Sequence, residues 1–258
     1  MMPHACTRWC AIAVVLLAAV PLVLASVADP ALLITASNAN GTSQLSVPFS
    51  NFTYDDYYHE WDYSHPSPVT LANGAKVSGL NLFIVDDSSY GVSIVMQYTF
   101  LAGTSLTNFT VDVGMVSFAP IPAALAAASM GDTFTLTELN YDQDNFAQLT
   151  ALDNYAYKTY YGQAGSPNEF FFHGSESAHQ FGGYGEGLIY NVDDNWPNVS
   201  GTFASLGVAV DRIHTTTAFS LTLLDKVEVQ QTFKLKVPEP AGVALLTAGG
   251  LLLMRRRR

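Results

Sequence analysis

The sequence predicts an all-β protein, a single β-sandwich of jelly-roll-like form with one or two short helices. Three observations support this fold class. Runs of β-branched and aromatic residues recur along the chain with partial alternation of apolar and polar positions. Turn-forming residues such as Gly74 and the Asp86–Ser89 segment separate these runs at intervals of about eight to twelve residues. No internal repeat or long low-complexity linker interrupts the central part of the 258-residue chain, which favours one domain.

The predicted strands follow one another through most of the chain. They are, in order, residues 80–85, 92–101, 109–118, 133–139, 188–192, 203–210, 218–224 and 227–237. In the last of these, apolar residues such as Val227 and Val229 alternate with charged ones. The alternation is interrupted at Gln230-Gln231, which predicts a β-bulge there.

Two helices are expected between the strands. Pro122 to Met130 is rich in alanine, begins with a proline and is followed by Gly131. Asn145 to Tyr161 has Asp144 before it as an N-cap. Both segments are therefore predicted to interrupt the sandwich as short helices.

Residues 1–28 have the composition of a signal peptide. Arg8 gives a positive start, and Ala11 to Leu24 is an apolar segment. Small residues suited to signal peptidase occur at Ser26-Val27-Ala28, with Val23-Leu24-Ala25 as a second cleavage site. The predicted organisation is a leader helix at 1–28, a secreted domain at 29–237 and a C-terminal segment at 238–258.

The C-terminal segment is a short apolar stretch that ends in basic residues. Its 14 apolar or small residues, Ala241 to Met254, make a helix of roughly 21 Å, whereas a bilayer core is about 30 Å thick. The arginines that follow hold their end on the cytoplasmic side. The prolines before the apolar run leave an extended, accessible peptide. A marginal membrane helix beside an accessible peptide would suit a membrane enzyme that cuts the peptide and releases the protein from its anchor.

A proline-glutamate-proline peptide, an apolar helix and a terminal arginine cluster, in this order, resemble the PEP-CTERM sorting signal of Gram-negative bacteria. The residues that carry the resemblance are Pro238, Glu239, Pro240, Arg255, Arg256, Arg257 and Arg258. The resemblance implies recognition and removal of the segment by an exosortase, a transpeptidase-like membrane enzyme. It also implies export, a transient anchor in the inner membrane, and association with exopolysaccharide or biofilm matrix. An ordinary anchor with an incidental proline-glutamate-proline is the alternative.

Composition restricts the chemistry of the secreted domain. Both cysteines, Cys6 and Cys10, lie in the leader, which excludes a disulfide, a thiolate metal site and a cysteine nucleophile from residues 29–237. That range contains 21 acids and six bases. Such a charge repels phosphate backbones, so no nucleic-acid partner is expected. It suits a soluble surface, a bound cation or a neutral sugar.

An aromatic and acidic stretch, Phe52 to Tyr63, is the candidate glycan-binding site. Sugars pack their CH faces on aromatic rings and bond their hydroxyls to carboxylates or amides, and this stretch offers both. The residues proposed to contact glycan are Tyr57, Tyr58, Trp61 and Tyr63. The alternative is that these rings belong to the core.

No metal ligand set is assigned, and no cofactor is expected. The histidine pairs at 59/65 and 173/179 have spacings unlike that of a zinc-hydrolase helix. The oxygen-rich turns at 140–145 and 193–195 leave calcium open, although the first departs from the EF-hand pattern.

The predicted function is that of an exported, non-catalytic surface or matrix protein associated with polysaccharide. The chain has no nucleophile elbow and no P-loop. Two alternatives stay open: a secreted carbohydrate-active enzyme with paired carboxylates, and a purely structural matrix protein. The expected partners are signal peptidase, an exosortase and polysaccharide.

Overall fold

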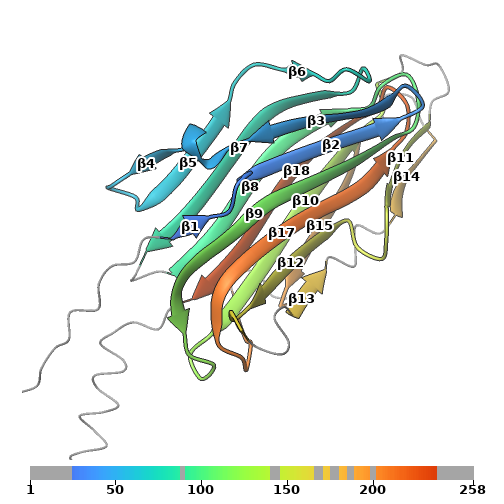
Figure 1. Ribbon diagram of the computed structural model, residues 1–258. Coiled ribbons are helices and arrows are strands. Elements are labelled where there is room, and N and C mark those ends of the chain that lie inside the picture. Colours follow the sequence, from blue (N-terminus) through green and yellow to red (C-terminus); the bar gives the residue numbers. More distant parts are fainter. Residues whose placement is uncertain are drawn as a thin grey trace, which may run out of the picture.

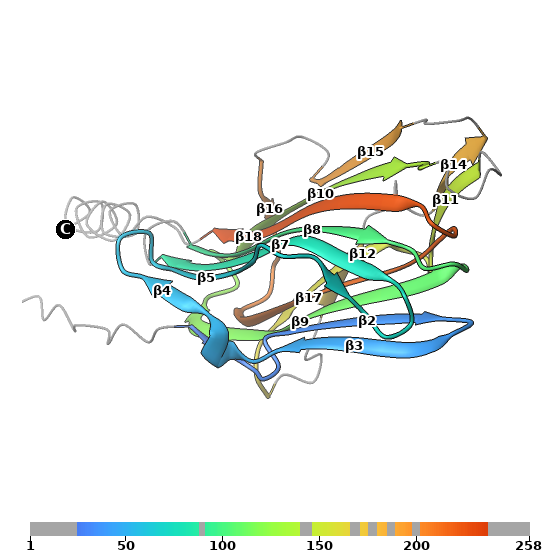
Figure 2. The same cartoon turned by 90° about the horizontal axis from the view of Figure 1, so that it is seen from above.

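The computed structural model describes two antiparallel β-sheets that pack face to face (Figures 1 and 2). The described residues are 25–87, 91–139, 146–165, 171–174, 180–184, 189–197 and 202–236. Within them the only helical element is one 3₁₀ turn, Phe49–Asn51. The prediction of an all-β sandwich is therefore confirmed, while the predicted leader and tail helices lie outside the described residues.

Each sheet has nine strands. Sheet A contains β1 (Ser26–Val27), β2 (Leu32–Asn38), β3 (Gly41–Val47), β9 (Thr107–Ile121), β11 (Phe146–Ala151), β12 (Tyr157–Gly162), β13 (Phe171–Gly174), β14 (Gln180–Tyr184) and β17 (Val210–Leu221). Sheet B contains β4 (Thr53–Asp55), β5 (Glu60–His65), β6 (Val69–Thr70), β7 (Lys76–Asp87), β8 (Gly91–Leu101), β10 (Ala127–Thr137), β15 (Ile189–Trp196), β16 (Ala204–Ser205) and β18 (Lys226–Lys236).

The chain crosses repeatedly between the two sheets. The main path of sheet A is β13-β12-β17-β9-β2-β3, and that of sheet B is β15-β10-β18-β8-β7-β5-β4. The successive strands β8, β9 and β10 thus alternate between the sheets. Of the last two strands, β17 pairs with β9 in sheet A, and β18 lies between β8 and β10 in sheet B. This connectivity places β10 between β15 and β18.

A cluster of aromatic rings joins the two sheets at the centre of the core. Phe100 of sheet B stacks on Phe109 of sheet A with ring centroids 4.4 Å apart and an interplanar angle of 16°. Phe219 lies beside Phe109, and its ring meets Phe134 of the opposite sheet edge-on at 6.1 Å. All four side chains are fully buried. Packing of this kind stabilises beyond the area it buries.

The predicted bulge at Gln230-Gln231 is wrong. The register of β18 with β8 and β10 runs unbroken through both residues. The alternation also holds, because Gln231 is 2 % exposed and takes an apolar residue's place in the core. Its Oε1 atom accepts hydrogen bonds from the Tyr98 hydroxyl at 3.0 Å and the Thr217 hydroxyl at 2.8 Å.

Both predicted helices are also wrong. In Pro122–Met130, one turn closes on the Pro122 carbonyl and β10 then begins at Ala127. The second segment forms β11 and β12, which pair with the edge of β17 opposite to β9. Buried Ala147 and Leu149 alternate with half-exposed neighbours in β11. Sheet pairing thus outweighed local helix propensity.

Two further predicted strands differ from the structure. Of residues 203–210, only Ala204–Ser205 pair as β16, and β17 begins at Val210. The strand predicted at 218–224 ends at Leu221, where a turn leads to β18. The other predicted strands fall within β7, β8, β9, β10, β15 and β18 apart from their end residues.

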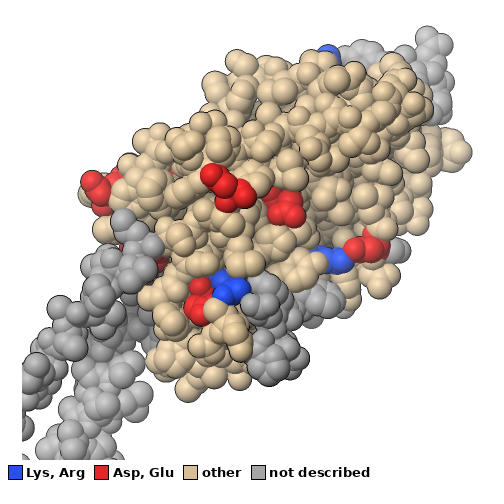
Figure 3. Space-filling model, viewed as in Figure 1, with Lys and Arg blue, Asp and Glu red and all other residues tan. Residues whose placement is uncertain are grey.

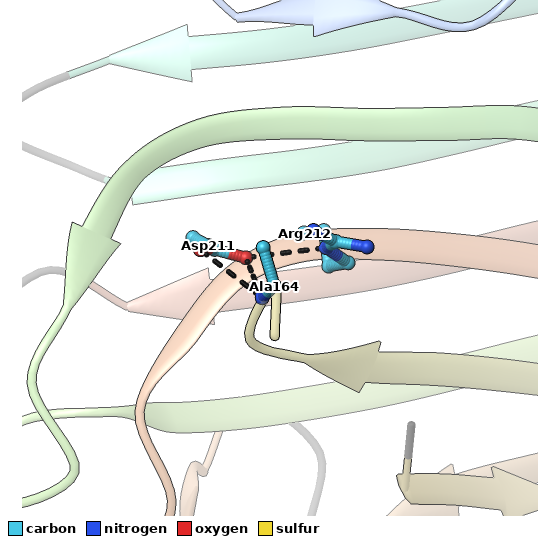
Figure 4. A network of polar contacts seen from close by, with 3 residues as sticks. All are labelled: Ala164, Asp211 and Arg212. Carbon is cyan, nitrogen blue, oxygen red and sulfur yellow. Dashed lines mark hydrogen bonds and ion pairs between the residues drawn. The ribbon is translucent and has the colours of Figure 1, made fainter. Parts of the chain in front are cut away.

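The turn after β12 is held to β17 by a small polar network. The backbone N–H of Ala164 donates to the two carboxylate oxygens of Asp211 at 3.0 and 3.3 Å, and Arg212 Nε donates to Oδ1 at 3.3 Å (Figure 4). Over the face that sheet A presents in Figure 1, acidic and basic side chains lie scattered on an otherwise uncharged surface (Figure 3). No helix among the described residues is long and apolar enough to cross a membrane.

We expect Phe219→Ala to lower the free energy of unfolding by about 3–5 kcal/mol, because it leaves a cavity between two sheets. Urea unfolding at fixed pH measures the change. Tyr57→Ala is the control, since Tyr57 is 82 % exposed and its loss should change stability by no more than about 0.5 kcal/mol. Equal effects of the two substitutions would contradict the central role of the aromatic cluster.

Candidate functional site

A cavity of about 590 Å³ lies on the outer side of sheet B, over β10, β15 and β18. Successive side chains of a strand point to opposite faces, so the residues of β10 that flank buried Met130 and Asp132 face outward. Gly131 is one of them, and its missing side chain leaves a depression between Asn195 and Thr232, its partners in register. A Cβ atom on Gly131 would lie 3.0 Å from Asn195 Oδ1.

Polar side chains surround this depression. Asp193 and Gln230 lie on either side of Thr133, and Lys234 lies opposite Ser129. The carboxylate and the ammonium supply an acceptor and a donor, and the amide of Gln230 supplies both. The cavity thus offers both donors and acceptors, and the hydroxyl groups of a sugar can bond to both.

An aromatic ring stands at the edge of the cavity. Phe203 lines it and is 37 % exposed. Lys236 Nζ lies 5.8 Å from the centroid of that ring. Because part of its ring is open to solvent, Phe203 can pack against the CH groups of a sugar.

The two carboxylates that line the cavity point in different directions. Asp193 is exposed, whereas Asp132 is 4 % exposed and faces the interior beside Gln231. Burial raises the pKa of Tyr98 and of Tyr157, and the nearby charge of Asp132 raises both further. Among the described lining residues the cavity therefore presents one outward carboxylate, whereas glycoside hydrolysis uses two that reach the same bond.

The structure separates the four aromatic residues proposed from the sequence. Tyr57 and Tyr58 lie in the turn between β4 and β5, 82 % and 60 % exposed, with their rings in a T-shaped contact at 4.8 Å. Asp55 Oδ1 accepts the backbone N–H groups of both. Trp61 and Tyr63 instead pack against the core, Trp61 with its ring 4.7 Å from that of Phe49. The stretch thus divides into an exposed pair and a partly buried pair.

The two oxygen-rich turns that leave calcium open in the sequence are only partly described. Residues 193–195 are not a turn but lie in β15, with Asp193 and Asn195 pointing outward. Residues 140–145 lie outside the described residues. In the ranges the structure covers, no three His, Asp or Glu side chains converge as metal ligands. His65 Nδ1 lies 2.8 Å from the Ser67 carbonyl oxygen.

Sequence reasoning missed the cavity because its residues come from four separate segments, 129–133, 193–197, 202–203 and 230–234. Within β18, Gln230, Thr232 and Lys234 are the outward positions of an alternating strand, a pattern that the sequence does show. No such signal identifies Phe203, which comes from a non-strand segment. The pairing of β10 with β15, β16 and β18 brings these segments together.

No protein-family model matches the chain, and no curated protein matches its sequence. Among solved structures, the chain is similar to TmCBM61, determined in complex with beta-1,4-galactotriose. The TM-score is 0.29 and the sequence identity 10 %, over 73 % of this chain and 90 % of that one. At this TM-score the likeness says nothing about the ligand or activity of this chain.

Three acidic residues, Asp55, Glu60 and Asp62, lie close together at β4 and β5, and their charges predict how stability depends on pH. Burial, followed by the charges of Asp55 and Asp62, raises the pKa of Glu60. A raised pKa means that folding favours the protonated carboxyl, so this contribution to stability is present at low pH and lost as pH rises through the folded-state pKa. We expect Glu60→Gln to raise the melting temperature at pH 7 and to leave it unchanged below about pH 4.

Asp153→Asn is the control of opposite sign. Burial favours a raised pKa for Asp153, but hydrogen bonds from the Lys158 side chain and the Tyr155 backbone N–H outweigh it and lower the pKa. The stability it contributes is present above the unfolded-state pKa and lost as pH falls. Asp153→Asn should therefore lower the melting temperature at pH 7. Thermal unfolding at pH 3.5 and pH 7 measures both, and a decrease for Glu60→Gln at pH 7 would contradict the assignment.

Proposed function

We propose that the chain is an exported, non-catalytic surface or matrix protein that binds neutral polysaccharide in the cavity over β10, β15 and β18. The observation that carries this proposal is the cavity's lining. It combines a depression at Gly131, donors and acceptors on both sides, and the exposed ring of Phe203. These are the elements of a sugar site.

The charge balance supports a neutral glycan over an anionic one. The chain carries 22 acids and 11 bases, so its field repels polyanions. Within the cavity, Lys234 and Asp193 supply one charge of each sign. A neutral hydroxyl group can donate to the Asp193 carboxylate and accept from the Lys234 ammonium.

The arrangement of carboxylates favours binding over catalysis. Asp193 is the outward carboxylate of the lining, and Asp132 is turned into the core. A carbohydrate-active enzyme is the second candidate, and measurable turnover of a polysaccharide would establish it. A purely structural matrix protein is the third, and would show neither turnover nor binding.

The proposal includes the route by which the protein reaches the cell surface. A signal peptide within residues 1–28 directs export and is removed by signal peptidase. The segment 238–258 then anchors the chain in the inner membrane. An exosortase recognises Pro238-Glu239-Pro240 and removes the whole segment. The secreted domain between them remains at the cell surface or in the matrix. The sequence patterns alone support these steps.

We also assign the sandwich to the jelly-roll class. In that arrangement the chain passes back and forth between two sheets, so that early strands pair with late ones. The pairing of β8 with β18, and of β9 with β17, supports the assignment. It brings the last strand of the domain into the cavity.

The binding proposal predicts that the double substitution Asp193→Ala and Gln230→Ala weakens glycan binding about tenfold or more. Each hydrogen bond to a sugar contributes about 0.5–1.5 kcal/mol, and about 1.4 kcal/mol corresponds to a factor of ten. Both residues are exposed, so the fold should be retained. Affinity electrophoresis through neutral polysaccharides and the host's exopolysaccharide, with and without EDTA, measures the binding.

Tyr57→Ala and Tyr58→Ala are the matched controls, since they remove exposed rings away from the cavity. Loss of retardation in these variants alone would move the site to the β4–β5 turn. Retardation that disappears in EDTA would bring calcium into the site. Free migration of the unaltered protein through every gel would overturn the binding proposal.

The sorting proposal predicts that replacing Pro238, Glu239 and Pro240 by alanine leaves a larger, membrane-retained form in the host. Cell fractionation and immunoblotting measure its size and location. Replacing Val237 alone by alanine is the control and should leave processing intact. Release of the triple variant at the normal size would refute recognition of the Pro-Glu-Pro peptide.

A further inference from the structure

Residues 26–28 form part of the folded sandwich although they lie in the segment that resembles a leader. Ser26 and Val27 form β1, which pairs antiparallel with Ser117 and Val116 of β9. Val27 packs against the core. The next residue, Ala28, donates its backbone N–H to the Met115 carbonyl oxygen at 2.9 Å. Three consecutive residues are therefore bound to one strand of sheet A.

Strand β9 contains a position shaped for this segment. A Cβ atom on Gly114 would lie 2.4 Å from the Ala28 carbonyl oxygen and 2.6 Å from that of Pro30, distances that no real contact adopts. The backbone N–H of Gly114 also donates to the Ala31 carbonyl oxygen at 2.9 Å. A glycine inside a strand weakens it unless another backbone approaches closely. Here the approaching backbone is that of residues 28–31.

We propose that signal peptidase cuts between Ala25 and Ser26, so that the mature protein begins at Ser26 and retains β1. This rests on the proposed export. Of the two cleavage sites that the sequence offers, Val23-Leu24-Ala25 leaves β1 intact, whereas Ser26-Val27-Ala28 removes it. Cleavage after Ala28 would expose the edge of β9 at Val116 and remove Ala28, whose carbonyl oxygen lies closest to the Gly114 position.

The surroundings of the new N-terminus suit a positive charge. In the uncut chain the backbone N–H of Ala25 donates to Asp86 Oδ2 at 2.6 Å. Cleavage after Ala25 creates an α-ammonium on the adjacent residue, Ser26, and this group is protonated at pH 7. The Asp86 carboxylate, which is half-buried beside Asp87, is thus one residue away from a cation that can replace the lost donor.

Intact-mass measurement and N-terminal sequencing of the exported protein test the proposal directly. We expect a chain that begins at Ser26. A chain that begins at Asp29 would overturn the cleavage position while leaving export intact. An uncut precursor retained in the cytoplasm would instead refute the export proposal and this inference with it.

Two substitutions separate the cleavage sites further. Ala25→Phe places a large residue where signal peptidase needs a small one, and we expect the precursor to accumulate. Ala28→Phe changes an exposed residue and should leave cleavage unaltered. The reverse outcome would assign the cut to Ala28.

A third measurement tests whether β1 belongs to the mature fold. Residues 26–237 and 29–237 are compared by thermal unfolding, each chain produced with its N-terminus released by a protease. We expect the shorter chain to melt at least about 2 °C lower, since it lacks the pairing of β1 with β9. Equal melting temperatures would mean that β1 contributes nothing to the fold and would remove the structural reason for a cut after Ala25.

Discussion

Strand β10 is paired on both edges, with β18 along its whole length and with β15 over eight residues. This double pairing fixes the facing direction of every side chain on three strands, because a slip of one residue would exchange the two faces. Phe134 then reaches Phe219 across the core, while Gly131 faces solvent. The hydrophobic core and the candidate binding cavity consequently lie on opposite faces of sheet B, and the same strand register determines both.

The buried polar cluster is a consequence of this arrangement. Gln231 stands beside Asp132 in register, and both point between the sheets. The amide oxygen of Gln231 accepts from Tyr98 of sheet B and from Thr217 of sheet A, so the cluster joins the sheets by hydrogen bonds where the aromatic rings do not. Interior polar groups of this kind require partners, and they restrict which strands can face one another.

The two ends of the sandwich illustrate different kinds of boundary. At the N-terminal side, the sequence predicts a leader that ends at Ala28 or at Ala25, whereas pairing with β9 and backbone contacts of Gly114 and Met115 bind residues 26–31 into sheet A. Small residues suit both signal peptidase and a close backbone approach, so composition cannot separate the two roles. At the C-terminal side, β18 runs to Lys236, next to the predicted sorting segment.

The sequence by itself determined the strand-rich fold class and most of the long strands. It did so because alternation in segments such as β10 and β18 is a local property. It also contains the peptide Pro238-Glu239-Pro240, on which the proposed sorting rests. Tertiary structure decided the rest. The predicted helix at 145–161 became β11 and β12 through pairing with β17, and the one at 122–130 became a turn and the start of β10. Partners distant in sequence account for the burial of Gln231, and strand pairing assembles the cavity over β10, β15 and β18. Such features depend on which strands become neighbours, and local propensity contains no information about that choice.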